Sequence, residues 1–409
     1  MADGEIVYDE LLSVMGRGLQ PNAIRKLTAL LGRRDIISLA AGAPSSETFP
    51  VEALAEIAAR VIRSRGQFAL QYGPTRGPQS LLEAIAEMLG GRGINATPSE
   101  IVVTSGSQQG LDLAARLLID PGDVAMVELP SYIGGIIALH NARAEMVGVR
   151  QDDAGLNIED LREKIIVLRQ AGRRVKCVYT IPNFQNPSGV TLTLERREQL
   201  VALADEFDLL IVEDDPYFDL AFSAAAHPPA MASLRPERVI YLGSFSKVLA
   251  PGLRAAYLRA PAALADKIEL AKEGADLSTS VLDQAIVLEA LRSGLVEKRL
   301  PELRQFYEVR CRAMLAALDQ CAPASAHWTR PTGGFFILLE LAAELDATAL
   351  LPQALDCGVA YVPGQPFFVD GGGASTLRLA YSKETPEKIS EGVARLGRVL
   401  RGEPRAEAV

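Results

Sequence analysis

The sequence VIYLGSFSKVLAPGLR, residues Val239–Arg254, carries the strongest indication of how this chain folds. Its first part, Val239–Leu242, is a continuous apolar run of the kind found in strands buried on both faces of a parallel sheet. The Gly-Ser-Phe-Ser turn that follows leads directly to a lysine, Lys247. Ligand sites in parallel α/β sheets lie at the carboxyl ends of the strands. The stretch therefore predicts an α/β protein in which Lys247 lies in a ligand site.

Four more apolar runs precede this one along the chain. They are Ile101–Thr104, Val124–Val127, Cys177–Thr180 and Leu209–Glu213. Helix-period segments such as Leu194–Phe207 lie between such runs. This alternation is typical of βα units around a mostly parallel sheet. We expect these runs and Val239–Leu242 to form the centre of one large α/β domain.

We expect the chain to divide into three parts. Residues 1–35 form an N-terminal arm with one helical pattern, Ala23–Leu31, and residues 36–290 form the large α/β domain. Residues 291–409 contain charged helical segments, an apolar run at Gly333–Leu341 and a helix at Pro386–Leu400. These features predict a smaller α+β domain, against which the arm packs.

Charge and hydropathy exclude several classes of protein. The 409 residues hold 51 Asp and Glu against 42 Lys and Arg, a formal net charge of −9, with no Lys/Arg run. This balance argues against a nucleic-acid surface. The N-terminal sequence MADGEIVYDE is acidic where a signal peptide would be basic, and no stretch approaches the roughly 18 apolar residues of a membrane span. We expect a cytoplasmic protein without nucleic-acid or membrane partners.

Cysteine and histidine are too few to supply the chemistry. The chain has four Cys, with no Cys-x-x-Cys pair, and three His. These counts argue against a disulfide scaffold and against a zinc finger or a multi-His metal site. A Walker A loop is excluded because no Gly-Lys dipeptide occurs, and the G-x-S-x-G motif of hydrolases is also missing. No metal is expected, and the chemistry must come from other residues.

The residues around Lys247 indicate a carbonyl cofactor. A lysine among small hydroxyl residues at a strand end can lose its proton through desolvation and become a nucleophile for an aldehyde. Ser244 and Ser246 offer hydroxyl groups, and Arg254 offers a planar fork suited to a phosphate. A lysine together with phosphate donors suggests pyridoxal 5′-phosphate held as a Schiff base. Taken alone, the stretch could equally be a solvated lysine beside a Ser-rich turn.

Three other strand ends carry groups that this cofactor would need. Asp214, in LLIVEDDPY, could pair with the pyridine nitrogen and keep it protonated, whereas Asp215 could cap the next turn. Asn186, in TIPNFQNPSG, could hydrogen-bond the phenolic oxygen, although Asn-Pro turns are common without any function. Ser107 and Gln108, in IVVTSGSQQGLDL, begin a helix after a strand. Both could hold a phosphate, although a plain helix cap would explain Ser107 equally well.

These stretches occur together with LAAGAPSSETFP, LQYGPTRG, LPSYIGG, TGGFF and LRLAY. In order and spacing, the set resembles pyridoxal-phosphate enzymes of fold type I, aminotransferase class I/II, over essentially the whole chain. Within this family, the motif sequences most resemble those of the group that contains 2-aminoadipate and kynurenine aminotransferases. The resemblance implies a large domain with a mostly parallel central sheet flanked by helices, plus a smaller α+β domain.

The resemblance also implies a role for each matched position around the cofactor. Lys247 corresponds to the lysine that forms the Schiff base, Asp214 to the partner of the ring nitrogen, and Tyr132 to the aromatic that stacks on the ring. Asn186 and Tyr217 correspond to the pair at the phenolic oxygen. The phosphate would be held by Ser107, Gln108, Ser244, Ser246 and Arg254.

Further matched positions concern the substrate and a second subunit. Arg378, in LRLAY, corresponds to the arginine that binds the substrate α-carboxylate, and Gly42 would let the backbone approach the same group. Arg25 corresponds to an arm arginine that meets a distal carboxylate, a role for which Arg17 could compete. Tyr72 corresponds to a residue that reaches the phosphate of the neighbouring subunit. A homodimer with active sites at the interface is therefore implied.

The implied activity is transfer of an amino group from an L-amino acid to a 2-oxo acid such as 2-oxoglutarate by a ping-pong mechanism. The donor could be 2-aminoadipate, an aromatic or branched-chain amino acid, or a glutamate-like one. One alternative is a lyase or decarboxylase on the same fold, because cofactor anchoring does not fix which Cα bond breaks. Another is a cofactor-binding regulator domain, which would need a DNA-binding module ahead of this fold.

Overall fold

The computed structural model describes residues 8–18, 36–223 and 228–403. Its centre is a sheet in the order β2-β9-β8-β7-β6-β3-β4-β5. These strands are β2 (Ile101–Thr104), β9 (Ala256–Arg259), β8 (Val239–Ser244), β7 (Leu210–Asp214), β6 (Val175–Thr180), β3 (Val124–Leu129), β4 (Glu145–Asp152) and β5 (Gly155–Leu156). Neighbours from β8 through to β4 pair in parallel, whereas β9 is antiparallel to both β2 and β8, and β5 is antiparallel to β4. The predicted mostly parallel sheet is confirmed.

The predicted strand set was partly wrong. We expected Ile101–Thr104 near the centre, but β2 is an edge strand that pairs only with β9. The sheet also contains β9, β4 and β5, none of which was predicted. In β4 the residues are mostly half-buried or exposed, so its sequence EMVGVRQD lacks the continuous apolar run that marked the other strands.

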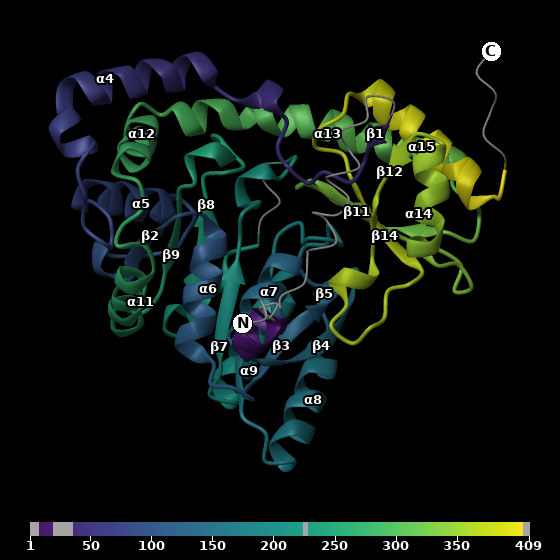
Figure 1. Ribbon diagram of the computed structural model, residues 1–409, viewed down its shortest axis with the longest axis horizontal. Coiled ribbons are helices and arrows are strands. Elements are labelled where there is room, and N and C mark those ends of the chain that lie inside the picture. The colour runs from purple at the N-terminus through teal and green to yellow at the C-terminus, as the bar shows by residue number, and fades with distance from the viewer. Residues whose placement is uncertain (1–7, 19–35, 224–227, 404–409) are drawn as a thin grey trace, which may run out of the picture.

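Helices cover both faces of this sheet (Figure 1). Along β8, Ile240 and Leu242 point into one hydrophobic core, while Val239 and Tyr241 point into a second core on the other face. The first core is closed by α6 (Ser107–Leu118), α7 (Ile133–Asn141) and α11 (Ala262–Asp276). The second is closed by α4 (Val51–Ala69), α5 (Gln79–Gly91), α8 (Ile158–Gln170), α9 (Leu194–Glu206) and α12 (Val281–Arg292). Two-sided burial explains why the strands lack polar alternation.

The carboxyl-terminal part forms a second unit beside the sheet. Its strands are β10 (His327–Trp328), β11 (Phe336–Glu340), β14 (Thr376–Ala380) and β13 (Val362–Pro363), paired antiparallel in that order. Helices α14 (Ala347–Asp356) and α15 (Pro386–Leu400) pack beside them. The long α13 (Leu295–Cys321) runs from α12 to α15 and connects the two units (Figure 1).

The segment after residue 35 joins this second unit. Strand β1 (Ile37–Ser38) pairs in parallel with β12 (Val359–Ala360). The predicted boundary at residue 36 did not anticipate this pairing, and the division into domains stays a prediction. The helical pattern Ala23–Leu31 lies outside the described residues, whereas α1 (Tyr8–Leu11), α2 (Val14–Gly18) and the short α10 (Met231–Leu234) lie within them.

None of the helices in the described ranges is both long and apolar enough to cross a bilayer.

Candidate active site

A cavity of about 540 Å³ lies at the carboxyl ends of the central strands, where the second unit meets the sheet. Its walls bring together most of the predicted site residues, which come from both units. These are Gly42, Ser107, Gln108, Tyr132, Asn186, Asp214, Tyr217, Ser244, Ser246, Lys247, Arg254 and Arg378. Of the remaining two, Tyr72 does not line the cavity, and Arg25 lies outside the described residues.

Lys247 follows β8, lines this cavity and is half-buried. Its Nζ is 5.8 Å from the ring centre of Tyr217 and 5.7 Å from that of Phe335. Burial lowers the pKa of Lys247 to about 8, although the nearby Asp214 favours the charged form. A substantial fraction of the amine is therefore neutral near pH 8, as a nucleophile or a proton acceptor requires.

Asp214 is the last residue of β7 and is buried. The hydroxyl of Tyr179 donates a hydrogen bond to its Oδ2 at 3.0 Å. Its Oδ1 is also buried, yet no donor among the described residues reaches it. Burial raises the pKa of Asp214 to about 7. The carboxylate thus presents one unused acceptor to the cavity, which suits a ligand that carries a proton on a ring nitrogen.

The adjacent Asp215 faces away from the cavity. It accepts hydrogen bonds from Nδ2 of Asn183 at 2.9 Å and from the hydroxyl of Tyr241 at 3.2 Å. Arg197 Nη2 in turn donates to Oδ1 of Asn183 at 2.7 Å. Asp215 therefore ties the loop before Asn186 to the central sheet rather than capping a turn.

An anion cradle forms where α6 begins. Gly106, just before the helix, has a φ of 89°, and a Cβ at this position would collide with the guanidinium of Arg254. Arg254 has a φ of 47° and donates from Nη2 to the carbonyl of Ser105 at 3.1 Å. Gln108 is held by a hydrogen bond from its Nε2 to the carbonyl of Gly134 at 2.8 Å. The amino end of α6 and this guanidinium thus lie together at one end of the cavity, as anion binding requires.

Arg378, on β14, forms a second cationic position. Its Nη1 donates to Oδ1 of Asn186 at 3.0 Å and its Nη2 to the carbonyl of Ala40 at 2.8 Å. Its guanidinium lies over the ring of Phe336 at 4.4 Å, and its buried Nε has no acceptor among the described residues. Burial lowers the pKa of Arg378 to about 10. Within the part of the chain that the structure describes, this buried cation has no carboxylate partner, so it is well suited to an anionic ligand. A Cβ at Gly42 would lie 2.5 Å from the ring of Phe336, so this position in the cavity wall requires glycine.

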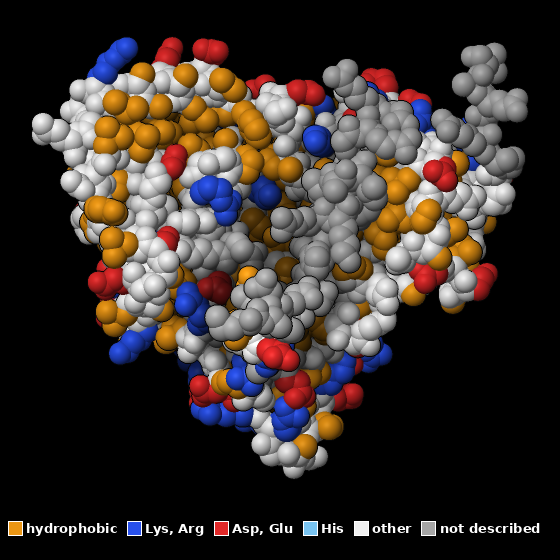
Figure 2. Space-filling model, in the orientation of Figure 1, with side chains coloured by type: hydrophobic (Ala, Val, Ile, Leu, Met, Phe, Trp, Pro, Cys, Tyr) orange, Lys and Arg blue, Asp and Glu red, His pale blue; other side chains and the backbone are white. Residues whose placement is uncertain are grey.

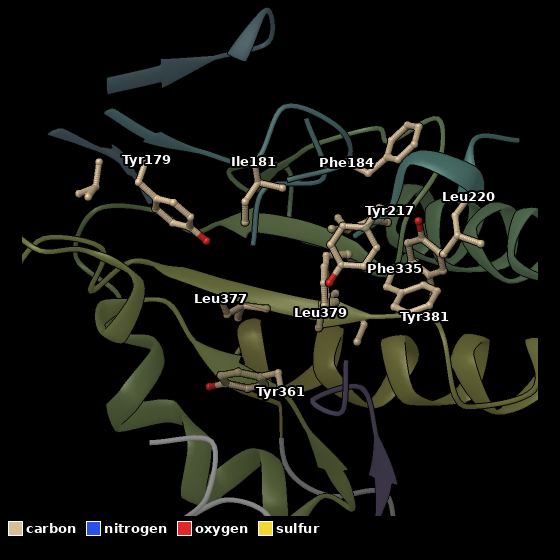
Figure 3. Close-up of a cluster of buried hydrophobic side chains, with 14 of the residues drawn as sticks. Tyr179, Ile181, Phe184, Tyr217, Leu220, Phe335, Tyr361, Leu377, Leu379 and Tyr381 are labelled. Carbon is tan, nitrogen blue, oxygen red and sulfur yellow. The ribbon is translucent and has the colours of Figure 1, made fainter. Parts of the chain in front are cut away.

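Aromatic side chains enclose the cavity on the side of the second unit. Tyr217 is buried and packs edge-on against Phe335, with ring centres 5.5 Å apart. Figure 3 shows Tyr217 among Phe335, Tyr381 and Leu379, where the two units meet. Burial raises the pKa of Tyr217, while a hydrogen bond with Asn186 acts in the opposite direction. The Tyr217 hydroxyl therefore stays protonated and can donate to a ligand oxygen.

Sequence reasoning missed three residues in or behind this site. Lys383 lines the cavity, Tyr179 bonds Asp214, and Glu128 holds the loop that carries Asn186. Tyr179 lies within the run Cys177–Thr180, which was treated as an ordinary strand, and Glu128 directly follows the run Val124–Val127. The signal that could have identified them is a hydrogen-bonding side chain at the same strand end as Asp214.

Tyr72 lies just after α4 and is 78% exposed. The same helix and the residues after it expose Ile62, Phe68 and Leu70. Figure 2 shows apolar side chains gathered at the end of the molecule where α4 lies. Arg17 lies on α2, where its Nη1 donates to the carbonyl of Leu12 at 2.8 Å, and it does not line the cavity.

Comparison with known proteins identifies the family. The model of the aminotransferase class I and II family matches residues 34–396. The aromatic-amino-acid aminotransferase 1 of Thermococcus litoralis is 41% identical over 397 residues, 97% of this chain and 95% of the relative. The 2-aminoadipate transaminase of Thermus thermophilus is 43% identical over 387 residues, 94% and 95% of the two chains.

A solved structure agrees with the fold and with the predicted cofactor. The alpha-aminoadipate aminotransferase of Thermus thermophilus, complexed with N-(5'-phosphopyridoxyl)-L-leucine, has a TM-score of 0.89 and 41% identity. The match covers 97% of this chain and 99% of that one. The chain therefore belongs to the aminotransferase class I and II family and is a pyridoxal-phosphate-dependent aminotransferase of fold type I.

Proposed function

We propose that the chain moves the amino group of an L-amino acid to a 2-oxo acid such as 2-oxoglutarate, with Lys247 as the residue that transfers the proton. The donor would be 2-aminoadipate, an aromatic or branched-chain amino acid, or a glutamate-like one. The observation that carries this proposal is the half-buried Lys247, the pKa of which is lowered to about 8, near Asp214 with its unused oxygen. The names of two relatives, an aromatic-amino-acid aminotransferase and a 2-aminoadipate transaminase, support the aromatic and 2-aminoadipate donors.

The cavity fits pyridoxal phosphate. Oδ1 of Asp214 would accept from the ring nitrogen, since it is the buried acceptor left without a donor among the described residues. Tyr132 would stack on the ring. The phosphate would lie in the anion cradle and be held by Ser107, Gln108, Ser244, Ser246 and Arg254. When bound, the cofactor supplies an aldehyde and an electron-withdrawing ring that stabilises negative charge at the substrate Cα.

The chain's own residues would hold the substrate and move its proton. Arg378 would bind the α-carboxylate through its guanidinium, with Gly42 allowing the close approach. The neutral amine of Lys247 would take the Cα proton on Nζ and hold it for return. Asn186 and Tyr217 would hydrogen-bond the phenolic oxygen, and the contacts of Asn186 with Tyr217 and with Arg378 support this role.

We also propose a homodimer with each site at the interface. Tyr72 is exposed next to an apolar surface on α4, and such surfaces commonly mark protein contacts. Covering this surface with a second copy would bring Tyr72 toward the partner's phosphate. Sedimentation should give twice the 43.9 kDa of one chain, and Tyr72→Phe should weaken cofactor binding without dissociating the dimer. The cytoplasmic location stays a prediction from the sequence.

Lys247→Ala tests the central assignment. The variant should lose the visible absorbance of the Schiff base and all turnover, because the other lysine in the described cavity lining, Lys383, is exposed. Lys388→Ala, at an exposed lysine outside the cavity, serves as the control. Mixing the wild-type holoenzyme with glutamate should yield pyridoxamine phosphate. Its absence, with the glutamate consumed, would instead support the lyase or decarboxylase alternative.

A further inference from the structure

The cavity contains a cation to which none of the roles above applies. Lys383 follows β14, lines the cavity and is exposed, so it lies at the mouth. No hydrogen bond or ion pair of its side chain is formed with any residue that the structure describes. The long flexible side chain of Lys383 is therefore available to a ligand that enters the cavity.

Hydrogen bonds hold the chain just before Lys383 in place, although the described residues form none with the Lys383 side chain. The hydroxyl of Ser382 donates to the carbonyl of Ala43 at 2.7 Å. The amide of Ala380 donates to the carbonyl of Leu39, also at 2.7 Å. These bonds fix the start of the Lys383 side chain against the turn at residues 41–44, which forms one wall of the cavity. Lys383 thus belongs to the same wall as Gly42, where the substrate carboxylate is proposed to lie.

Charge matching indicates what Lys383 binds. Among the described residues, the cavity lining holds four cationic side chains, Lys247, Arg254, Arg378 and Lys383, and one carboxylate, Asp214. In the proposed function, Lys247 carries the cofactor, Arg254 faces the phosphate and Arg378 faces the α-carboxylate. When the substrate has one carboxylate, the ammonium of Lys383 stays solvated, which costs little free energy because the side chain is exposed. A substrate with two carboxylates supplies the missing anion.

We propose that Lys383 binds the distal carboxylate of dicarboxylic substrates, namely 2-oxoglutarate, 2-oxoadipate and their amino-acid counterparts. This inference rests on the proposed function, because it takes the α-carboxylate to lie at Arg378. Lys383 is then a specificity-determining residue, which favours dicarboxylates without excluding apolar side chains. The same cavity would then accept an amino-acid donor with an apolar side chain and a 2-oxo acid acceptor with a side-chain carboxylate.

The test compares Lys383→Met with wild type in one half-reaction. The pyridoxamine-phosphate form of each holoenzyme is mixed with 2-oxoglutarate, 2-oxoadipate or the monocarboxylic 4-methyl-2-oxopentanoate. We expect kcat/KM to fall about 10-fold for both dicarboxylates, as for loss of a hydrogen bond to a charged group, and to stay unchanged for the third acid. Lys383→Arg should restore most of the activity, and the selective loss should shrink at high ionic strength.

Lys388→Met is the matched control, because this exposed lysine lies outside the cavity and pairs with Glu384 at 3.7 Å. Equal losses for all three acids, or no loss for any, would overturn the proposal for Lys383. So would a selective loss found in Arg25→Ala but not in Lys383→Met. If wild type converts none of the acids, the proposed function itself fails, which is a different result.

Discussion

The hydroxyl of Tyr179 donates to Oδ2 of Asp214 at 3.0 Å and leaves Oδ1 of the same carboxylate buried without a partner among the described residues. Tyr179 lies on β6 and Asp214 on the neighbouring strand β7, so the bond is fixed by parallel pairing. The bond also opposes burial, because it favours the charged carboxylate. Tyr179 thereby orients Asp214 and helps it remain the anion that a protonated ring nitrogen needs.

Removing this hydroxyl should therefore weaken the cofactor site. In Tyr179→Phe the pKa of Asp214 should rise further above about 7, since the hydrogen bond that lowers it is lost. We expect roughly 10-fold weaker cofactor binding at pH 7, about the value of one hydrogen bond to a charged group, measured by titration of apoenzyme. Tyr257→Phe is the control for lost packing. Tyr257 is also buried, but its hydroxyl accepts from Arg92 rather than donating to Asp214. Equal weakening in both variants would contradict the role given to Tyr179.

The lowered pKa of Lys247 predicts the pH dependence of cofactor capture. Only the neutral amine attacks an aldehyde, and burial moves the pKa from 10.5 to about 8. The rate at which apoenzyme gains visible absorbance with pyridoxal phosphate should rise with pH, with a midpoint near 8. Asp214→Asn should move this midpoint lower, because the negative charge of Asp214 favours the protonated amine. Asp319→Asn, at a carboxylate that pairs with Arg330 outside the cavity, should leave it unchanged. A wild-type midpoint near 10.5 would show that the lysine is not desolvated.

The sequence predicts those strands and helices whose residues show a clear local hydrophobic pattern. The apolar run at Val239 predicted β8 and the lysine after it, and Pro386–Leu400 matches α15 residue for residue. The residues that complete the site are brought together over long distances. Arg378 bonds Asn186 from 192 positions away, across the two units, so no periodicity reports the contact. Resemblance to a family identified Arg378, and Asn186 was already a candidate because it follows a predicted strand, whereas Lys383 and Glu128 carried no motif and were missed.

Glu128 is the buried carboxylate that holds the loop before Asn186. It accepts from the hydroxyl of Thr180 at 2.6 Å, the amide of Ile181 at 3.1 Å and Nε2 of Gln185 at 3.1 Å. Glu128→Gln would turn an NH₂ group toward these donors. We expect a loss of about 1–3 kcal/mol in the free energy of unfolding at pH 5, the usual cost of leaving buried donors unpaired. Denaturant unfolding measures it, with the exposed Glu195→Gln as control.

The pH dependence of that loss has a defined sign. Burial raises the pKa of Glu128 from 4.5 to about 7, so the folded state keeps a proton that the unfolded state releases between these values. The contribution of Glu128 to stability therefore falls as pH rises from 4.5 to 7. Because glutamine does not titrate, the stability difference between wild type and Glu128→Gln should shrink over the same range. A difference that stays constant from pH 5 to 7 would mean that the buried carboxyl is already ionised at pH 5.

Gly106 should be the glycine on which the anion cradle depends. Its φ of 89° disfavours any L side chain, and a Cβ would occupy the space of the Arg254 guanidinium. Gly106→Ala should displace that guanidinium, break its bond to the Ser105 carbonyl and weaken cofactor binding by more than about 10-fold, the loss of one charged hydrogen bond. Gly252→Ala, nearby in the chain with open space around its Cβ position, should bind as wild type does. Pyridoxal without the phosphate should bind equally weakly to wild type and Gly106→Ala, because the cradle has nothing to hold. If Gly106→Ala weakens binding of pyridoxal as much as that of its phosphate, the substitution disturbs the whole cavity rather than the cradle.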